Sequence, residues 1–169
     1  MHLRKRILPA FCVALATLAL PALADTTKKD DQEMVMMAGH GGHAEVKAGN
    51  LAKTKASNAG VKQFGEMMVT DHTKAGKELE TAAKSASLTY PADTDAKHKE
   101  MLDKLMKLSG AAFDEAYIDD MVAGHRDMED LLEKMSADAK NSQVKEWAKR
   151  TLPAVQAHLK KAEELQASM

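Results

Sequence analysis

Five ionisable residues of this chain lie where a helical protein ordinarily places apolar side chains. Read with helical periodicity, each falls on the apolar side of its own segment, and the five are Glu45, His72, Asp114, His125 and His158. Carboxylate oxygens and imidazole nitrogens are common ligands of iron, manganese, zinc and copper. Burying an unpaired carboxylate costs several kcal/mol, so Glu45 and Asp114 need partners, and the histidines are the candidates.

Two interpretations of these five residues stay open at this point. In the first, they hold a transition metal between the helices. In the second, they form a buried layer of histidine–carboxylate pairs that fixes the helix register without any metal. Helical periodicity shows that the polar faces coincide in direction, but it does not show that they share one level along the helices.

Several neighbouring residues are secondary candidates for the same site. Tyr117 falls at the edge of the arc that holds Asp114 and His125, and Asp71 precedes His72. Thioether and imidazole together favour copper, and His125 with Met128 is one such pair. The alternative is that Met121, Met128 and Met135, spaced by seven residues, simply form the core face of a helix.

The string "GHGGH" at 39–43 resembles a metal-binding loop, but helical periodicity interprets it differently. Gly41 falls on the same face as Glu45 and is expected to allow a close helix approach. His40 and His43 fall on the opposite face. Three residues apart, these two histidines either bind a metal weakly at the surface or belong to a solvated face.

Other common chemistries lack their motifs in this sequence. There is no G-x-S-x-G for a serine nucleophile, no phosphate-binding glycine loop followed by Lys-Ser/Thr, and no C-x-x-C-H for haem attachment. The one cysteine, Cys12, lies in an N-terminal apolar segment. These absences favour a binding or structural protein over an enzyme but leave catalysis undecided.

The first 24 residues are predicted to be a signal peptide. Three basic residues precede an apolar stretch that is too short for a comfortable membrane span, and Ala22–Leu23–Ala24 forms an A-x-A cleavage site. We expect a periplasmic or otherwise extracytoplasmic protein, with association with the outer membrane as an open alternative, and no transmembrane segment after cleavage. Cleavage removes three of the 24 basic residues and none of the 25 acidic ones, leaving a formal charge of about −4. No basic run survives, so we expect no nucleic-acid partner, and protein partners remain unknown.

The remaining chain has helical composition, rich in Ala, Lys, Glu, Leu and Met. Residues 25–30 are expected to form a polar leader and residues 31–169 a single domain. Breakers at "SNAG", "LTYPAD", "SG" and "DAKNSQ" predict helices over about 31–56, 61–87, 94–108, 110–137 and 143–169. The prediction is an all-α, up-and-down four-helix bundle with a short additional connecting helix. No internal repeat is evident.

Three long strings carry a family resemblance: "GGHAEVKAGNLAKTKASNAGVKQFGEMMVTDHTKA", "LSGAAFDEAYIDDMVAGH" and "WAKRTLPAVQAHLKKAEEL". They resemble the exported bacterial family catalogued as domain of unknown function 4142, whose members are often labelled outer-membrane proteins. The likeness spans about residues 34–165. It implies a ferritin-like four-helix bundle, and the matching motif positions are Glu45, Asp71, His72, Phe113, Asp114, Tyr117, His125, Pro153 and His158. The activity of that family is unsettled.

The chain departs from the usual ferritin-like di-iron site, which requires Glu-x-x-His on two helices. The residues three positions before the candidate histidines are Val69, Val122 and Val155. We therefore expect an exported bundle that binds a single transition metal through buried Glu, His and Asp side chains, in envelope or stress physiology. The alternative is a non-catalytic envelope module whose buried polar layer binds no metal.

Overall fold

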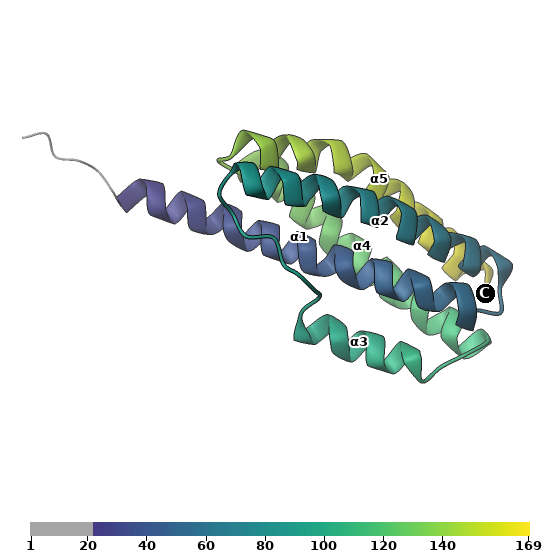
Figure 1. The fold of residues 1–169 in the computed structure, drawn as a ribbon. Coiled ribbons are helices and arrows are strands. Elements are labelled where there is room, and N and C mark those ends of the chain that lie inside the picture. The colour runs from purple at the N-terminus through teal and green to yellow at the C-terminus, as the bar shows by residue number, and fades with distance from the viewer. Residues whose placement is uncertain (1–21) are drawn as a thin grey trace, which may run out of the picture.

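The structure is a computed structural model that describes residues 22–169. Within this range it contains five helices and no strand (Figure 1): α1 (Ala22–Lys55), α2 (Ala59–Ser85), α3 (Ala96–Met106), α4 (Ala111–Asp138) and α5 (Ser142–Ser168). The predicted signal peptide lies outside the described residues except for its last three positions, which begin α1. Across residues 22–169, no helix combines the length and the apolar character that crossing a membrane requires.

The first helix begins nine residues earlier than the sequence predicted. The expected polar leader, residues 25–30, is part of α1 instead of an irregular segment. The string "DTTKKDD" contains neither proline nor glycine, so nothing in it interrupts a helix. Lys29 and Glu33 also lie four residues apart, with Nζ 4.0 Å from Oε1, an arrangement that supports helical structure.

The four long helices lie side by side, and each contacts two others (Figure 1). α1 packs against α2 and α4, and α5 packs against α2 and α4. Short turns join α1 to α2 and α4 to α5, so these two pairs form antiparallel hairpins. The connection from α2 to α4 carries α3 and runs back along the outside of the long helices.

This crossover sets the direction of the second hairpin. Gly110 N donates to Lys55 O at 2.8 Å, so α4 begins beside the end of α1. α2 and α4 consequently run in the same direction, and the order along the chain is up, down, down, up. The predicted up-and-down order, in which successive long helices alternate in direction, is therefore wrong. A short turn between α2 and α4 would have reversed the direction, whereas α3 carries the chain back along the length of the long helices.

Both hairpin turns are capped in the same way. Asn58 and Asn141 are the N-caps of α2 and α5, and each side-chain oxygen accepts from the backbone amides two and three positions later. Asp31 on α1 accepts from the backbone amides of Lys140 and Asn141, at 2.9 and 2.7 Å. At the other end of the molecule, Asp114 on α4 accepts from the corresponding amides of the first hairpin turn.

The apolar core is divided into two clusters along the helices. One is centred on Phe64, Phe113 and Tyr117, near the turn between α1 and α2. The other is centred on Leu79, Leu132 and Trp147, near the opposite end. Within the first cluster, α1 and α2 approach closely at Gly49 and Gly65: a Cβ atom at Gly49 would lie 2.6 Å from Gly65 O. This close crossing lies one turn from Glu45.

Candidate metal centre

Each long helix contributes one buried polar residue to the level between the two apolar clusters. These residues are Glu45 on α1, His72 on α2, His125 on α4 and His158 on α5. Their exposed fractions are 5%, 7%, 0% and 5%. In sequence, each lies between residues of one cluster and residues of the other. The four polar faces therefore meet at one level, which helical periodicity alone left open.

The three imidazole rings form a nearly equilateral triangle. Ring centroids are 5.5 Å apart for His72 and His125, 5.4 Å for His72 and His158, and 5.6 Å for His125 and His158. No pair of rings lies parallel, since the interplanar angles run from 46° to 89°. The rings are therefore tilted relative to one another and do not stack.

One nitrogen of each ring is held by an oxygen atom outside the triangle. His72 Nδ1 lies 2.8 Å from Glu45 Oε2, and His125 Nδ1 lies 2.9 Å from the backbone carbonyl of Met121. Glu45 also reaches His125, with Oε1 3.5 Å from Nδ1. His158 Nε2 lies 2.9 Å from Asp71 Oδ2. Because the Met121 carbonyl and the Asp71 carboxylate are acceptors, His125 Nδ1 and His158 Nε2 carry the ring proton.

The other nitrogen of each ring has no protein partner. His72 Nε2, His125 Nε2 and His158 Nδ1 are buried and accept no hydrogen bond. The three rings can each offer one nitrogen such that all lie within 4.8 Å of one another. Buried polar atoms in native proteins are nearly always satisfied, so these three unpaired nitrogens form a group that could hold a metal ion.

The electrostatics of this layer favour a carboxylate beside mostly neutral imidazoles. Burial acts to raise the pKa of Glu45, but His72, His125 and His158 outweigh it and lower that pKa to about 2. Burial lowers the pKa of His125, and the neighbouring His72 adds to this effect despite the attraction of Glu45. Burial likewise lowers the pKa of His158. Both rings are therefore neutral at pH 7, the form in which imidazole binds metals.

His72 differs from the other two histidines. Burial acts to lower its pKa, but the Glu45 carboxylate, which contacts its Nδ1, and Asp71 raise the pKa overall. Glu45 Oε2 makes no aligned hydrogen bond despite its short distance to the ring.

Asp114, the fifth predicted ligand, is not brought to the histidines. Its carboxylate accepts from the backbone amides of Ser57 and Asn58, at 3.1 and 2.9 Å, and from the Ser57 hydroxyl. It lies eleven residues before His125 on α4, which corresponds to roughly 16 Å along the helix axis. Its burial therefore reflects its role at the first hairpin turn, equivalent to that of Asp31 at the second.

The secondary candidates divide between the centre and its surroundings. Asp71 reaches the centre through His158. Tyr117 is fully buried in the cluster centred on Phe64, and its hydroxyl has no hydrogen-bond partner. Burial and the Glu45 carboxylate together raise the pKa of this hydroxyl well above the ordinary value of 10. Met121 supplies the carbonyl that holds His125, and its own side chain lies in the core, as does that of Met128.

His40 and His43 hold the segment that follows α2. His40 Nδ1 lies 2.7 Å from Asp93 O, and His43 Nε2 lies 3.0 Å from Pro91 O. The ring of His43 also lies against Tyr90, with centroids 5.4 Å apart. The two rings therefore bind the crossover connection to α1 and do not form a solvated face.

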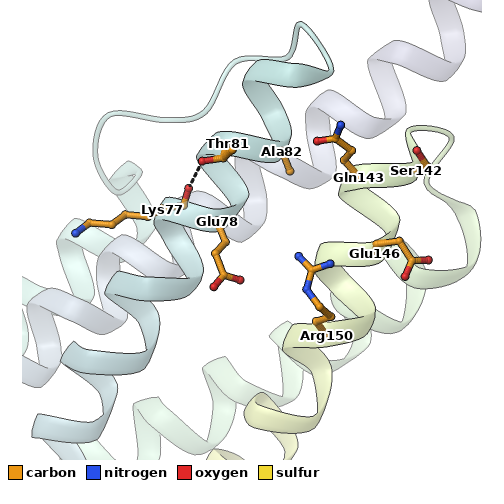
Figure 2. Close-up of a pocket in the computed structure, with 8 residues that line it drawn as sticks. All are labelled: Lys77, Glu78, Thr81, Ala82, Ser142, Gln143, Glu146 and Arg150. Atoms are coloured by element: carbon orange, nitrogen blue, oxygen red, sulfur yellow. Dashed lines mark hydrogen bonds between the residues drawn. The ribbon is translucent and has the colours of Figure 1, made fainter.

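A surface groove on these helices has a different character. A groove of about 480 Å³ lies between α2 and α5, and Figure 2 shows Glu78 and Arg150 extending into it from opposite sides. Thr81 donates to the Lys77 carbonyl within its own helix, at 2.9 Å (Figure 2). The groove mixes both signs of charge and includes none of the three histidines.

The structural role of one residue, Asp31, was not predicted from the sequence. Asp31 is 3% exposed and ties α1 to the second hairpin turn. It was placed at the predicted boundary of a helix, where an exposed aspartate is ordinary. The sequence does contain a signal for this role, because five residues of the first hairpin recur 83 positions later in the second. Asp31, Gly41, Ala56, Asn58 and Val61 recur as Asp114, Gly124, Ala139, Asn141 and Val144.

The described residues define an all-helical protein whose long helices enclose a buried layer of one glutamate and three histidines. The chain belongs to the family described as "Domain of unknown function (DUF4142)", which matches residues 16–165. The resemblance seen in the sequence motifs is thereby confirmed. No curated protein and no solved structure matches the chain.

Proposed function

We propose that this protein binds a single zinc(II) ion through His72 Nε2, His125 Nε2 and His158 Nδ1. The observation that carries this proposal is the set of three buried, unpaired ring nitrogens from three helices. Three histidines with a fourth position for water or another exchangeable ligand is a familiar zinc coordination. An all-imidazole set suits zinc, copper or iron better than manganese, which prefers oxygen.

The dimensions of the cluster support this assignment. An equilateral triangle with 4.8 Å sides has its centre about 2.8 Å from each corner, whereas zinc–nitrogen bonds are about 2.0–2.1 Å. Since 4.8 Å is the upper limit of the separations, each ring moves by at most about 0.7 Å to reach an ion.

The oxygen atoms around the triangle support the same proposal. Metal-binding histidines usually donate their second N–H to a carboxylate or a carbonyl, which fixes the tautomer and the ring orientation. Here Glu45 holds His72, the Met121 carbonyl holds His125, and Asp71 holds His158. These three acceptors orient the rings before any ion arrives, so little reorganisation opposes binding.

Calorimetric and thermal titration of the metal-free protein tests the proposal. We expect one zinc ion per chain and a stabilisation of about 2.7 kcal/mol when free zinc is one hundred times the dissociation constant. His125→Ala should abolish both effects, whereas His43→Ala, on α1 outside the triangle, should preserve them. Copper, iron and manganese salts measured in the same way establish the preference.

The alternative function is a polar layer that fixes the helix register without metal. The two carboxylate–histidine pairs, Glu45 with His72 and Asp71 with His158, favour it. It predicts that zinc leaves the melting temperature unchanged, or changes it equally in the wild type and in His125→Ala. Either outcome would reject the zinc proposal.

The wider assignment is also proposed. The single crossover carrying α3 supports a ferritin-like four-helix bundle, since that class contains one such connection. The N-terminal sequence pattern supports export to the periplasm, and a role in envelope or stress physiology accords with export. Cell fractionation with an antibody against the chain, compared between the wild type and a variant lacking residues 2–24, tests the location.

A further inference from the structure

A second cavity lies between α1, α3 and α4, on the side of Glu45 away from α5. It has a volume of about 250 Å³, and Glu45 lines its inner part. Glycines lie on two of its walls: a Cβ atom at Gly124 would meet no atom within 4 Å, and one at Gly41 would meet only the end of Met128. Helix α3 covers the α1–α4 seam here and supplies the outer wall.

Four methionines from three different helices line this cavity. They are Met37 on α1, Met101 on α3, and Met121 and Met128 on α4. Twelve methionines occur in the whole chain, so a third of them surround one hollow. Met121 and Met128 are buried, whereas Met37 is 60% exposed, so the thioethers extend from the core to the mouth.

An imidazole of fixed tautomer shares the cavity with these thioethers. His98 lines it from α3, one turn before Met101 on the same helix. His98 Nδ1 lies 2.7 Å from Asp95 Oδ1, which also accepts from the His98 backbone amide at 2.9 Å. Nδ1 is therefore the protonated nitrogen, and within residues 22–169 the Nε2 lone pair has no hydrogen-bond partner.

We propose that this cavity binds one copper(I) ion through His98 Nε2 and the thioethers of Met101, Met121 and Met128. Thioethers are soft ligands that select copper(I), and zinc, calcium and magnesium gain little from them. Asp95, Asp120 and Asp127 also line the cavity, against the single cation of Lys97. Their combined field raises the concentration of cations at the mouth without supplying the soft ligands themselves.

The copper site is separate from the three-histidine centre and does not depend on it. Glu45 lies between the two, because its oxygens contact the Nδ1 atoms of His72 and His125. The nitrogens proposed to bind zinc are the opposite ones in those rings. The two sites also differ in ligand chemistry. The three-histidine centre offers only imidazole nitrogens, whereas the cavity offers thioethers together with one imidazole, so each site favours a different ion.

Silver(I), a diamagnetic substitute for copper(I), provides a direct probe in protein labelled with ¹³C at the methionine methyl groups. We expect addition of one equivalent to shift the methyl signals of Met101, Met121 and Met128. The signals of Met106 and Met169, which lie outside the cavity and are largely exposed, should stay in place. Shifts confined to the exposed methionines, or no shifts, would overturn the proposal.

Anaerobic competition with a chromogenic copper(I) chelator measures the affinity in variants. The double substitution Met101→Leu with Met128→Leu preserves side-chain volume, and it should weaken copper(I) binding at least tenfold. Met106→Leu, on the same helix as Met101, is the matched control and should leave the affinity unchanged. His98→Gln, at a partly exposed position, should weaken binding without affecting folding.

The same competition separates this site from the proposed zinc centre. The double variant His72→Ala with His125→Ala should retain copper(I) binding while it loses zinc. Loss of copper(I) in that variant, together with unchanged binding in Met101→Leu/Met128→Leu, would place copper at the histidines and reject the cavity site. Retained copper(I) with no zinc response in the wild type would reject the zinc proposal alone.

Discussion

Glu45 Oε2 lies 2.8 Å from His72 Nδ1, and this contact joins α1 to α2 at the level where the three histidines meet. The other oxygen of the same carboxylate, Oε1, lies 3.5 Å from His125 Nδ1, so one carboxylate orients two of the three rings. Both partners are buried, and the carboxylate therefore acts in surroundings where water does not compete.

Replacing Glu45 by glutamine tests this orienting role. Glutamine keeps the side-chain shape but removes the negative charge that makes the two rings stronger ligands. We expect zinc affinity to fall between tenfold and a hundredfold, the usual effect of losing such a partner. Competition with a zinc-binding dye measures the change, and Glu66→Gln, at an exposed position on α2, is the control.

The same substitution predicts a pH dependence in the metal-free protein. A carboxyl group whose pKa falls from 4.5 to about 2 on folding adds stability above pH 4.5, and this stability is lost as the pH falls toward 2. The stability advantage of wild type over Glu45→Gln should therefore be present at pH 5–6 and shrink below pH 4.5. We expect it to be on the order of 3 kcal/mol at its maximum, by analogy with other buried pairs that lose one partner.

Urea denaturation of both proteins in the presence of a chelator, between pH 3 and 6, measures this difference. The range stays below 6.5 because His72, whose pKa is raised, adds stability that is lost only as the pH increases through its folded pKa. An advantage that persists unchanged at pH 3 would contradict the assignment of a buried, charged Glu45.

Gly49→Ala should destabilise the protein by about 1–3 kcal/mol. The added methyl group would lie 2.6 Å from Gly65 O, so α1 and α2 must move apart beside Glu45. Gly42→Ala, also within α1, meets no atom within 4 Å and should instead stabilise by about 0.5–1 kcal/mol. Equal melting temperatures for the two variants would show that the close crossing of α1 and α2 is not rigid.

Asp31→Ala and Asp114→Ala should destabilise the protein by similar amounts, about 1–3 kcal/mol each, because each leaves two backbone amides without an acceptor. Neither substitution should change zinc affinity, since both residues contact the hairpin turns and not the histidines. Glu115→Ala, at the exposed position after Asp114, is the control. A loss of zinc binding in Asp114→Ala alone would restore that residue to the metal site.

The helical faces of the candidate residues could be predicted from sequence, but their heights along the helices could not. Periodicity gives the direction of a side chain around the axis to within a fraction of a turn. Height depends on where each helix starts relative to its neighbours, which the caps and turns decide. Glu45, His72, His125 and His158 have both properties in common, whereas Asp114 shares only the direction.

The number of helices and most of their ends also followed from glycine, proline and asparagine positions. The direction of the second hairpin did not, because it depends on how far α3 extends along the molecule. The 83-residue offset was hidden for a related reason. Equivalent positions in the two hairpins keep caps and close contacts, such as Asn58 and Asn141, but the residues of the centre have no counterpart at that offset.

The division into two hairpins has a topological consequence. His72 belongs to the first hairpin, and His125 and His158 belong to the second, so neither hairpin alone can complete the triangle. An ion at the centre would close a loop of about 50 residues through the crossover, with an entropic effect on the unfolded chain similar to that of a disulfide. The chain has a single cysteine, at position 12, so no intramolecular disulfide can provide such a cross-link.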